Sequence, residues 1–548
     1  MFMNSKQDAG DVIVIGAGHN GLVAAAYLRR AGLDVTVLEA SPTVGGMIST
    51  NPVIDGAPGH RINEGGIQAS LFRASSIEQD LNLAKYGFKQ LIADPFHVHL
   101  DPEGPSLAFW QDASKTVQEI RHFSPRDAVK YREFADSLDA AMDLAIPFML
   151  GHPTRPDFRT ALSMLPKGAR RRKELWPLLS FFTSSHAEIV EERFDHPLVR
   201  GALASMPPFC WMTQDGTGWA LIYVGMCHRT NSARFLGGTG ALTDALHAYL
   251  KDHGAEVRTN ARVTELLVDG GAVVGVQLDS GEQLRAANVM ASCSPKATLA
   301  QLLPEGTLPD HLERRANAIP TNVLETTTLK IDVAVSGKLT MPRHQAWRDQ
   351  HRGDGLDLRK PIVSWQTYEE HKEAWNRVVQ RRWPEVIPFI GIIPSAIDPT
   401  QAPDGQDTFW LWSGITPRNP EAEPWETVRD QIGDRVLAEC ATVYEGLDSL
   451  EMGRRVFSAP DLEERFHVPD GNVYHVEPVG ARFGPLRPAQ GFGSYDVPVP
   501  GLWITGAGTH PTGGISGIPG KNAADAFLAT AKCAGGLPAR ARQLVTSR

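Results

Sequence analysis

Residues 10–50 constrain the fold of this 548-residue chain more than any other stretch. Residues 11–15 predict a short buried strand, because four of the five are β-branched. Gly16, Gly18 and Gly21 follow at once in G-x-G-x-x-G spacing. The apolar run 22–31 then predicts a helix that ends before Gly32, and residues 34–38 predict a second strand closed by Glu39.

This order of elements is typical of a dinucleotide site. Gly16 permits a tight strand-to-helix turn, Gly18 lets the backbone approach a pyrophosphate, and Gly21 lets the helix pack against the strand. The helix N-terminus offers N–H groups to the phosphates. Glu39 is placed to accept hydrogen bonds from a ribose, which favours the unphosphorylated adenosine of FAD or NAD. The alternative is a strand–helix–strand unit that merely packs.

Composition narrows the function further. A net charge of −9 with pI near 6.1 gives no electrostatic case for nucleic acid. The five cysteines are scattered, with no C-x-x-C pair, which predicts an intracellular, cytoplasmic protein and argues against a dithiol-relay flavoenzyme. Residues 1–10 lack the apolar core of a secretory signal, and no stretch is apolar enough for a spanning helix.

Residues 71–205 are mainly helical in pattern. Ser124 and Pro125 predict a helix start, with serine as N-cap and proline at the first helical position. A basic run at 167–173 lies beside the apolar residues 175–182. This pair predicts either a peripheral contact with an anionic membrane or a solvated loop next to a core helix.

The middle of the chain contains two segments whose predicted secondary structure differs from that of the helical segment before them. Residues 235–253 predict a glycine turn and a helix, and 256–289 predict a β-meander with tight turns, before a return towards the first sheet at 291–295. Residues 320–480 are β-rich and hold seven of the 12 tryptophans, which suggests a second core. We therefore predict a cap domain with a helical part at 101–229 and a β-rich part at 321–479.

The tail contains a second glycine-rich turn. Residues 501–505 predict a strand, 521–534 predict an alanine-rich helix, and the 15 residues 506–520 between them include six glycines. Such a loop before a helix is typical of anion binding. Because glycine loses much backbone entropy on folding, we favour cofactor contact over a purely structural loop.

Three distant segments carry a family resemblance: GAGHNGL with Glu39, GGTGALTDAL with its meander, and GLWITGAGTHPTGGISGIPGKNAA. Together they resemble the phytoene desaturase-like FAD-dependent oxidoreductases, within the amine-oxidase-like flavoprotein group. The resemblance implies an α/β fold, in which a three-layer Rossmann-like FAD domain with a β-meander is formed by 10–100, 230–320 and 480–540, beside a mixed α+β cap. It also implies FAD contacts at Gly16, Gly18, Gly21, Glu39, Gly45, Gly46, Val263, Gly508, Ile515 and Asn522. Ala507 stands where many relatives of the wider group carry an acid, so the resemblance implies a ribityl contact through the backbone. Met47 stands where many amine oxidases carry an arginine, which weakens a carry-over from amine oxidases.

An enzyme of this kind lets the flavin supply the chemistry. The leading hypothesis is dehydrogenation or saturation of a carbon–carbon bond of an apolar unsaturated substrate, with hydride moving to or from flavin N5. His510, His475 and Tyr474 are the candidates for proton transfer, with turn capping as the alternative. A single dinucleotide fingerprint predicts that oxygen, a quinone or another protein exchanges the electrons. The rival hypotheses are a redox-neutral hydratase or isomerase of a small haloacrylate-like acid that uses reduced FAD, and a flavin-binding partner protein without turnover.

Overall fold

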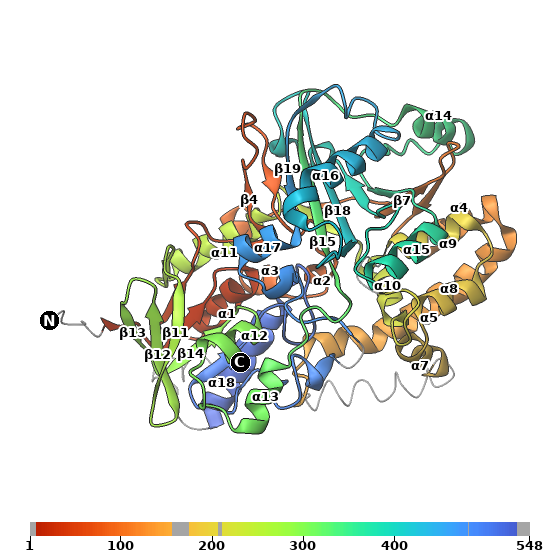
Figure 1. The fold of residues 1–548 in the computed structure, drawn as a ribbon. Helices are drawn as coiled ribbons and strands as arrows, with labels where there is room; N and C mark the ends of the chain where they lie inside the picture. The colour runs from red at the N-terminus through yellow and green to blue at the C-terminus, as the bar shows by residue number, and fades with distance from the viewer. Residues whose placement is uncertain (1–6, 156–174, 207–210, 480–481, 534–548) are drawn as a thin grey trace.

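A computed structural model describes residues 7–155, 175–206, 211–479 and 482–533. The basic run 167–173 lies outside the described residues. Figure 1 shows three regions: interleaved red, green and blue elements on one side, a teal sheet above them, and orange and yellow helices on the other side. No helix in the described ranges is long and apolar enough to cross a membrane.

The first region is built on a five-stranded parallel sheet assembled from distant parts of the chain. Its order is β10-β3-β2-β14-β20. The strands are β2 (Val12–Ile15), β3 (Val35–Leu38), β10 (Glu256–Arg258), β14 (Asn288–Ala291) and β20 (Leu502–Ile504). Glu256–Arg258 was expected in the meander, but it pairs with β3 instead, because the preceding helix provides the crossover that a parallel strand requires.

Two further layers cover this sheet. Val12 and Val14 pack towards α1 (His19–Arg30), α11 (Gly240–Asp252) and α18 (Ile518–Cys533). Ile13 and Ile15 face the meander of β11 (Val263–Asp269), β12 (Ala272–Leu278) and β13 (Gln283–Arg285), which β1 (Gln7–Asp8) extends. A parallel strand buried on both faces explains the continuous apolar run of β2. The predicted three-layer α/β fold is confirmed.

The second region is a seven-stranded mixed sheet of order β19-β15-β18-β17-β16-β7-β8. Its strands are β7 (His97–Leu100), β8 (Ser106–Phe109), β15 (Thr326–Val335), β16 (Ile362–Ser364), β17 (Ile390–Ile392), β18 (Asp407–Pro417) and β19 (Glu451–Phe457). The domain boundary predicted between residues 100 and 101 passes between the paired strands β7 and β8, so β7 lies with the cap sheet.

Alternation along β15 and β18 gives this sheet two different faces. Leu329, Ile331 and Leu411 pack into a core with α16 (Trp425–Ala441). Trp410 and Trp412 point to the opposite face, beside Ile67 of the first region. The cap sheet therefore presents aromatic side chains towards the FAD-type domain.

The third region is helical and begins as the sequence predicts. Ser124 is the N-cap of α5 (Pro125–Leu150), and its Oγ accepts a hydrogen bond from the Asp127 N–H at 3.1 Å. The core of this region is formed by α5 with α4 (Ala113–Phe123), α8 (His186–Arg193), α9 (Pro197–Ser205), α10 (Ile222–Thr230) and α15 (Tyr368–Val378). The remaining α-helices of all three regions, among the described residues, are α2 (Ser70–Arg73), α3 (Ile77–Asp80), α7 (Leu175–Thr183), α12 (Pro295–Ala297), α13 (Asp310–Asn317), α14 (Pro342–His351) and α17 (Ala459–Phe466).

Candidate active site

The glycine turn between β2 and α1 opens onto a cavity of about 600 Å³. Gly16 has φ +95°, a conformation that favours glycine. A Cβ on Gly21 would lie 2.0 Å from the carbonyl oxygen of Gly16, so the helix can start here only with glycine. A Cβ on Gly18 would meet no atom within 4 Å. Gly16 and Gly18 line the cavity, and Gly21 lies behind its wall.

Glu39 is positioned at the cavity by the backbone around it. Its two carboxylate oxygens accept hydrogen bonds from the N–H groups of Ala17 (2.7 Å) and Ser41 (2.9 Å). Each oxygen keeps a lone pair, so the carboxylate can also accept from a ribose hydroxyl. Val263, at the start of β11, lines the same part of the cavity. We call this part, lined by Gly16, Gly18, Glu39 and Val263, the nucleotide end.

Gly45 and Gly46 close the loop over the glycine turn. The N–H of Gly45 donates to the carbonyl of Ala17 at 2.9 Å, and Gly45 has φ +124°. A Cβ on Gly46 would lie 3.4 Å from the Cα of Gly18. Gly46 lines the cavity, whereas Gly45 supports the turn from behind.

The tail loop reaches the cavity through some of the predicted residues and not others. Ile515 lines it and is 5% exposed. Gly508 is absent from its lining and packs against Pro295, where a Cβ would lie 2.3 Å from Cδ. Asn522 also lies outside the lining: its Nδ2 donates to the carbonyls of Met149 (3.2 Å) and Gly151 (3.1 Å) at the end of α5. Its position therefore fits a helix-capping role.

His510, His475 and Tyr474 all line the cavity. His510 Nε2 lies 2.9 Å from the carbonyl of Phe148. Burial is the main cause that lowers the pKa of His510 and of His475 to about 4, so both rings are neutral at neutral pH. His475 adopts φ +62°, an uncommon conformation for a residue with a side chain. The Tyr474 side chain packs against Gly513, where a Cβ would lie 2.7 Å from Cδ1.

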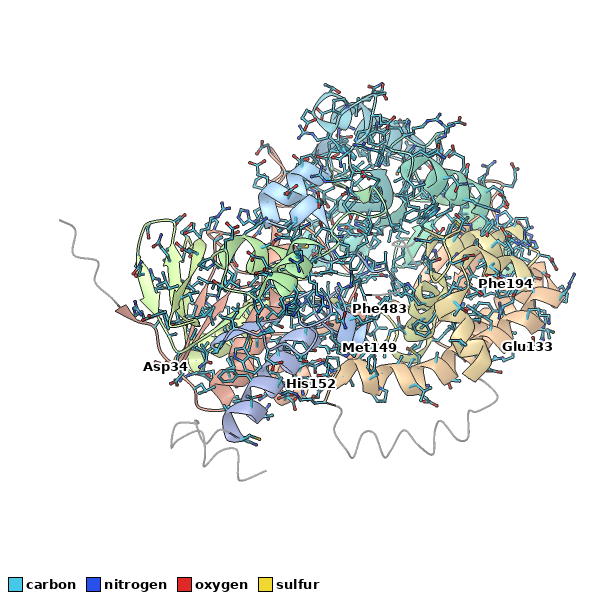
Figure 2. The ribbon with its side chains drawn as sticks, turned by 60° about the horizontal axis from the view of Figure 1, so that its bottom comes forward. Asp34, Glu133, Met149, His152, Phe194 and Phe483 are labelled. Carbon is cyan, nitrogen blue, oxygen red and sulfur yellow. The ribbon has the colours of Figure 1, made fainter. Side chains whose placement is uncertain are left out.

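Beyond these residues the cavity has apolar walls. Figure 2 shows Met149, near the end of α5, and Phe483 where the helical region meets the C-terminal part of the chain. We call this part the apolar end; it is lined by Leu71, Ala145, Phe148, Met149, Trp219, Ile222, Tyr223, Met226, Ile390, Trp410, Trp412 and Phe483. Side chains from the helical region and from the cap sheet thus both line it.

Sequence reasoning missed a charge cluster beside the nucleotide end. The buried carboxylate of Glu64 accepts from Arg455 (3.1 Å) and Arg465 (3.1 Å), and Arg465 lines the cavity. Burial alone would raise the pKa of Glu64, but hydrogen bonds from Arg465 and Asn51 outweigh it and lower that pKa to about 2. No local motif marks this cluster, because its members are up to 401 positions apart.

Sequence reasoning also missed a buried ion pair in the cavity wall. Lys330 of β15 lines the cavity, forms an ion pair with Asp332, and has its Nζ 5.5 Å from the centre of the Trp410 ring. Burial lowers the pKa of Lys330 and raises that of Asp332. Two charged residues at i and i+2, within a stretch of β15 (329–335) that is otherwise apolar, are a pattern that could have indicated this face.

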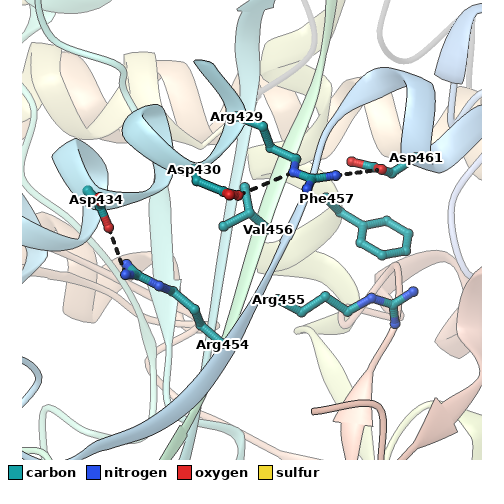
Figure 3. A pocket seen from close by; sticks show the side chains of 8 residues that line it. All are labelled: Arg429, Asp430, Asp434, Arg454, Arg455, Val456, Phe457 and Asp461. Carbon is teal, nitrogen blue, oxygen red and sulfur yellow. Dashed lines mark hydrogen bonds and ion pairs between the residues drawn. The ribbon is translucent and has the colours of Figure 1, made fainter. Parts of the chain in front are cut away.

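A second pocket, of about 570 Å³, lies between α16 and β19 and is lined by arginines and aspartates (Figure 3). Arg429 is bonded to Asp430 (3.3 Å) and Asp461 (3.2 Å), and Arg454 to Asp434 (2.7 Å). These charges largely neutralise one another. The predicted site residues face the first cavity and not this one.

Comparison with known proteins places this geometry in a family. Residues 21–380 match the family described as flavin containing amine oxidoreductase. A mouse protein named pyridine nucleotide-disulfide oxidoreductase domain-containing protein 2 is 31% identical over 94% of this chain and 92% of its own length. The chain belongs to the flavin-containing amine oxidoreductases.

Other comparisons agree with this assignment. Hydroxyneurosporene desaturase of Cereibacter sphaeroides is 26% identical over 96% of this chain and 98% of its own length. The solved structure of a putrescine oxidase has a TM-score of 0.59 at 16% identity, and the alignment covers 99% of this chain and 100% of that one. The predicted resemblance to phytoene desaturase-like enzymes is confirmed, and this flavin-containing amine oxidoreductase is an FAD-dependent enzyme.

The residues of the cavity fit FAD. The N-terminus of α1 has no side-chain cap and opens onto the cavity at Gly18, where a Cβ would find empty space. That combination suits a pyrophosphate approaching the backbone. Gly16, Gly18, Gly46, Glu39 and Val263 are thus the residues that would hold the ADP half. Ile515, Tyr474 and His475 line the continuation of the same cavity.

Proposed function

We propose that this FAD-dependent oxidoreductase dehydrogenates or saturates a carbon–carbon bond of an apolar unsaturated substrate. The observation that carries the proposal is the apolar end of the cavity, whose walls are aromatic and aliphatic side chains continuous with the FAD site. Such walls bind a hydrocarbon by removing its apolar surface from water. Hydroxyneurosporene desaturase, similar over nearly its whole length, bears a name that indicates chemistry of this kind.

The charges of the cavity argue against a small acid as substrate. Lys330, in the wall of the cavity, is already paired with Asp332. Arg465 belongs to the Glu64 cluster beside the nucleotide end. Arg262, which precedes Val263 at the nucleotide end, also lines the cavity. Among the described residues that line the apolar end, a carboxylate would therefore find no unpaired cation beside it, and an unpaired buried charge is costly.

Two sets of side chains, the walls of the apolar end and the histidines His475 and His510, would act on the substrate and its protons. FAD, when bound, takes up or returns a hydride. The walls of the apolar end orient the substrate and exclude water, and the neutral rings of His475 and His510 can accept a proton or a hydrogen bond at the cavity wall. We further propose oxygen, a quinone or another protein as the electron acceptor, because the sequence has only one strong dinucleotide fingerprint.

Anaerobic mixing tests this function. The purified flavoprotein is mixed with a polyene, an amine or a haloacrylate, and the visible absorbance of the flavin is followed. Bleaching of the oxidised flavin, or reoxidation of the dithionite-reduced flavin, by the polyene alone supports the proposal. Bleaching by the amine, or haloacrylate turnover only after dithionite reduction with the flavin remaining reduced, would replace it with amine oxidation or redox-neutral hydration.

A pair of tryptophan variants locates the substrate. Trp410→Ala enlarges the apolar end, and Trp425→Ala removes a comparably buried tryptophan on the other face of the cap sheet. We expect Trp410→Ala to weaken polyene binding at least about tenfold, while Trp425→Ala lowers only stability. Equal polyene binding by both variants would place the substrate elsewhere.

A further inference from the structure

A buried arginine lies directly behind the cavity wall. The Arg487 side chain is 0% exposed, and its guanidinium donates only to backbone carbonyls among the described residues. The acceptors are Tyr474 (2.9 Å) and Val476 (3.2 Å) in one loop, Ala507 (2.8 Å) and Thr509 (3.2 Å) in the tail loop, and Arg482 (3.4 Å). Arg487 thereby joins two chain segments that both reach the cavity.

The hydrogen bonds of Arg487 bracket His475. Nη2 of Arg487 donates to the carbonyl oxygens of the residues just before and just after His475, and its two N–H groups are shared with the carbonyl of Ala507. His475 has φ +62°, a conformation that costs about 1 kcal/mol or more in a residue with a side chain unless neighbours enforce it. Two bonds from one nitrogen to its flanking carbonyls are such a constraint. They hold the imidazole in the wall of the cavity.

The charge of Arg487 has no ionic partner in the part of the chain that the structure describes. The nearby Glu477 forms no ion pair with it, and burial raises the pKa of Glu477 to about 8, so this carboxyl is mainly protonated at neutral pH. Burial lowers the pKa of Arg487 to about 9, which leaves the guanidinium charged at neutral pH. Its field reaches the cavity, because it disfavours protonation of both His475 and His510.

We propose that Arg487 is the positioning residue of the flavin site. Its guanidinium sets the backbone around His475 and fixes the Ala507–Thr509 segment, and its positive charge favours added negative charge in the cavity. Arg487 would act on the cofactor that the family binds, whatever the substrate is.

Three variants separate this role from simple support of the fold. Arg487→Met removes the charge and the donors, and Arg487→Lys keeps the charge but cannot reach several carbonyls at once. Arg348→Met is the matched control, because Arg348 is equally buried but pairs with Glu119 and Asp354 in the cap. For each variant, FAD is titrated into the apoprotein, and the midpoint potential of the bound flavin and the melting temperature are measured.

We expect Arg487→Met to weaken FAD binding at least about tenfold and to lower the midpoint potential. Arg487→Lys should weaken FAD binding by a smaller factor and leave the potential close to wild type. Arg348→Met should lower only the melting temperature. If Arg487→Met does not fold, Arg487→Lys decides: unchanged FAD affinity overturns the proposal. If Arg487→Met folds and shows wild-type FAD affinity and a wild-type midpoint potential with only a lower melting temperature, Arg487 merely supports the fold and the proposal is wrong.

Discussion

Gly18→Ala is the perturbation that separates folding from cofactor binding most cleanly. The backbone of Gly18 has φ −69° and ψ 166°, which alanine adopts without strain, and its Cβ would meet nothing within 4 Å. Gly-to-Ala replacement at a compatible position stabilises by about 0.4–1 kcal/mol, whereas alanine is a poorer N-cap than glycine by a similar amount. The apoprotein should therefore change its free energy of unfolding by less than about 1 kcal/mol.

FAD binding should respond very differently. The new methyl group would occupy the space through which a pyrophosphate approaches the N-terminus of α1. Hydrogen bonds to a phosphate require donor–acceptor distances of about 3 Å, so a shift of about 1 Å breaks them. Each such bond to a charged group contributes about 1.5–3 kcal/mol. Loss of one should weaken FAD binding roughly ten- to hundred-fold.

The assay is titration of apoprotein with FAD, followed by flavin fluorescence, beside urea unfolding of the same apoprotein. Gly433→Ala in α16 is the matched control: its Cβ would lie 2.7 Å from Cγ2 of Val456, far from the cavity. It should lose about 1–3 kcal/mol of stability and keep its FAD affinity. Wild-type FAD affinity in folded Gly18→Ala would refute the assignment of the glycine turn.

Three other outcomes follow from buried polar groups. Burial lowers the pKa of His97 to about 3 and the pKa values of His186 and His371 to about 4. Because only the unfolded chain takes up these protons below about pH 6.5, the free energy of unfolding should fall between pH 6.5 and 4, by about 1–2 kcal/mol for each histidine at about pH 5. Urea unfolding measures this fall, and a flat profile would contradict it. Asn522→Ala should lower the free energy of unfolding by about 1–2 kcal/mol, measured by thermal unfolding, and leave the FAD affinity unchanged. Weaker FAD binding would show instead that Asn522 belongs to the cofactor site. Glu64→Gln should cost about 1–3 kcal/mol at neutral pH and remove the loss of stability that the wild type shows as pH falls from 4.5 towards 2; an unchanged acid profile would exclude this role.

The local parts of the fold could be predicted from the sequence because short-range physics determines them. The apolar run of β2, the glycine spacing and the helix start at Ser124 each depend on neighbours within a few residues. The prediction that Glu256–Arg258 belongs to the meander was wrong, because the sheet that a strand joins depends on residues far from it in the sequence. A three-residue strand has too little pattern to show which sheet it joins, and the crossover helix before it decided the pairing.

The parts of the site that escaped prediction depend on long-range contacts. Arg487 carries no motif, and its role is visible only when five backbone carbonyls meet at its guanidinium. Glu64 and Arg465 pair across 401 positions. Asn522 was placed near the cofactor by analogy with the family, and its bonds to the carbonyls at the end of α5 could not be read from the sequence. Burial of polar groups cannot be read from a single sequence.

In the proposed function, one cavity joins FAD to an apolar substrate for carbon–carbon redox chemistry. The most direct test is an anaerobic single turnover with a polyene, started once from oxidised and once from dithionite-reduced enzyme, in which the change in flavin redox state and the change in carbon–carbon double bonds are both quantified. We expect, without oxygen, one double bond gained for each flavin bleached or one double bond lost for each reduced flavin reoxidised. Product formed with no change in the flavin spectrum, or bleaching without a change in the polyene, would contradict it.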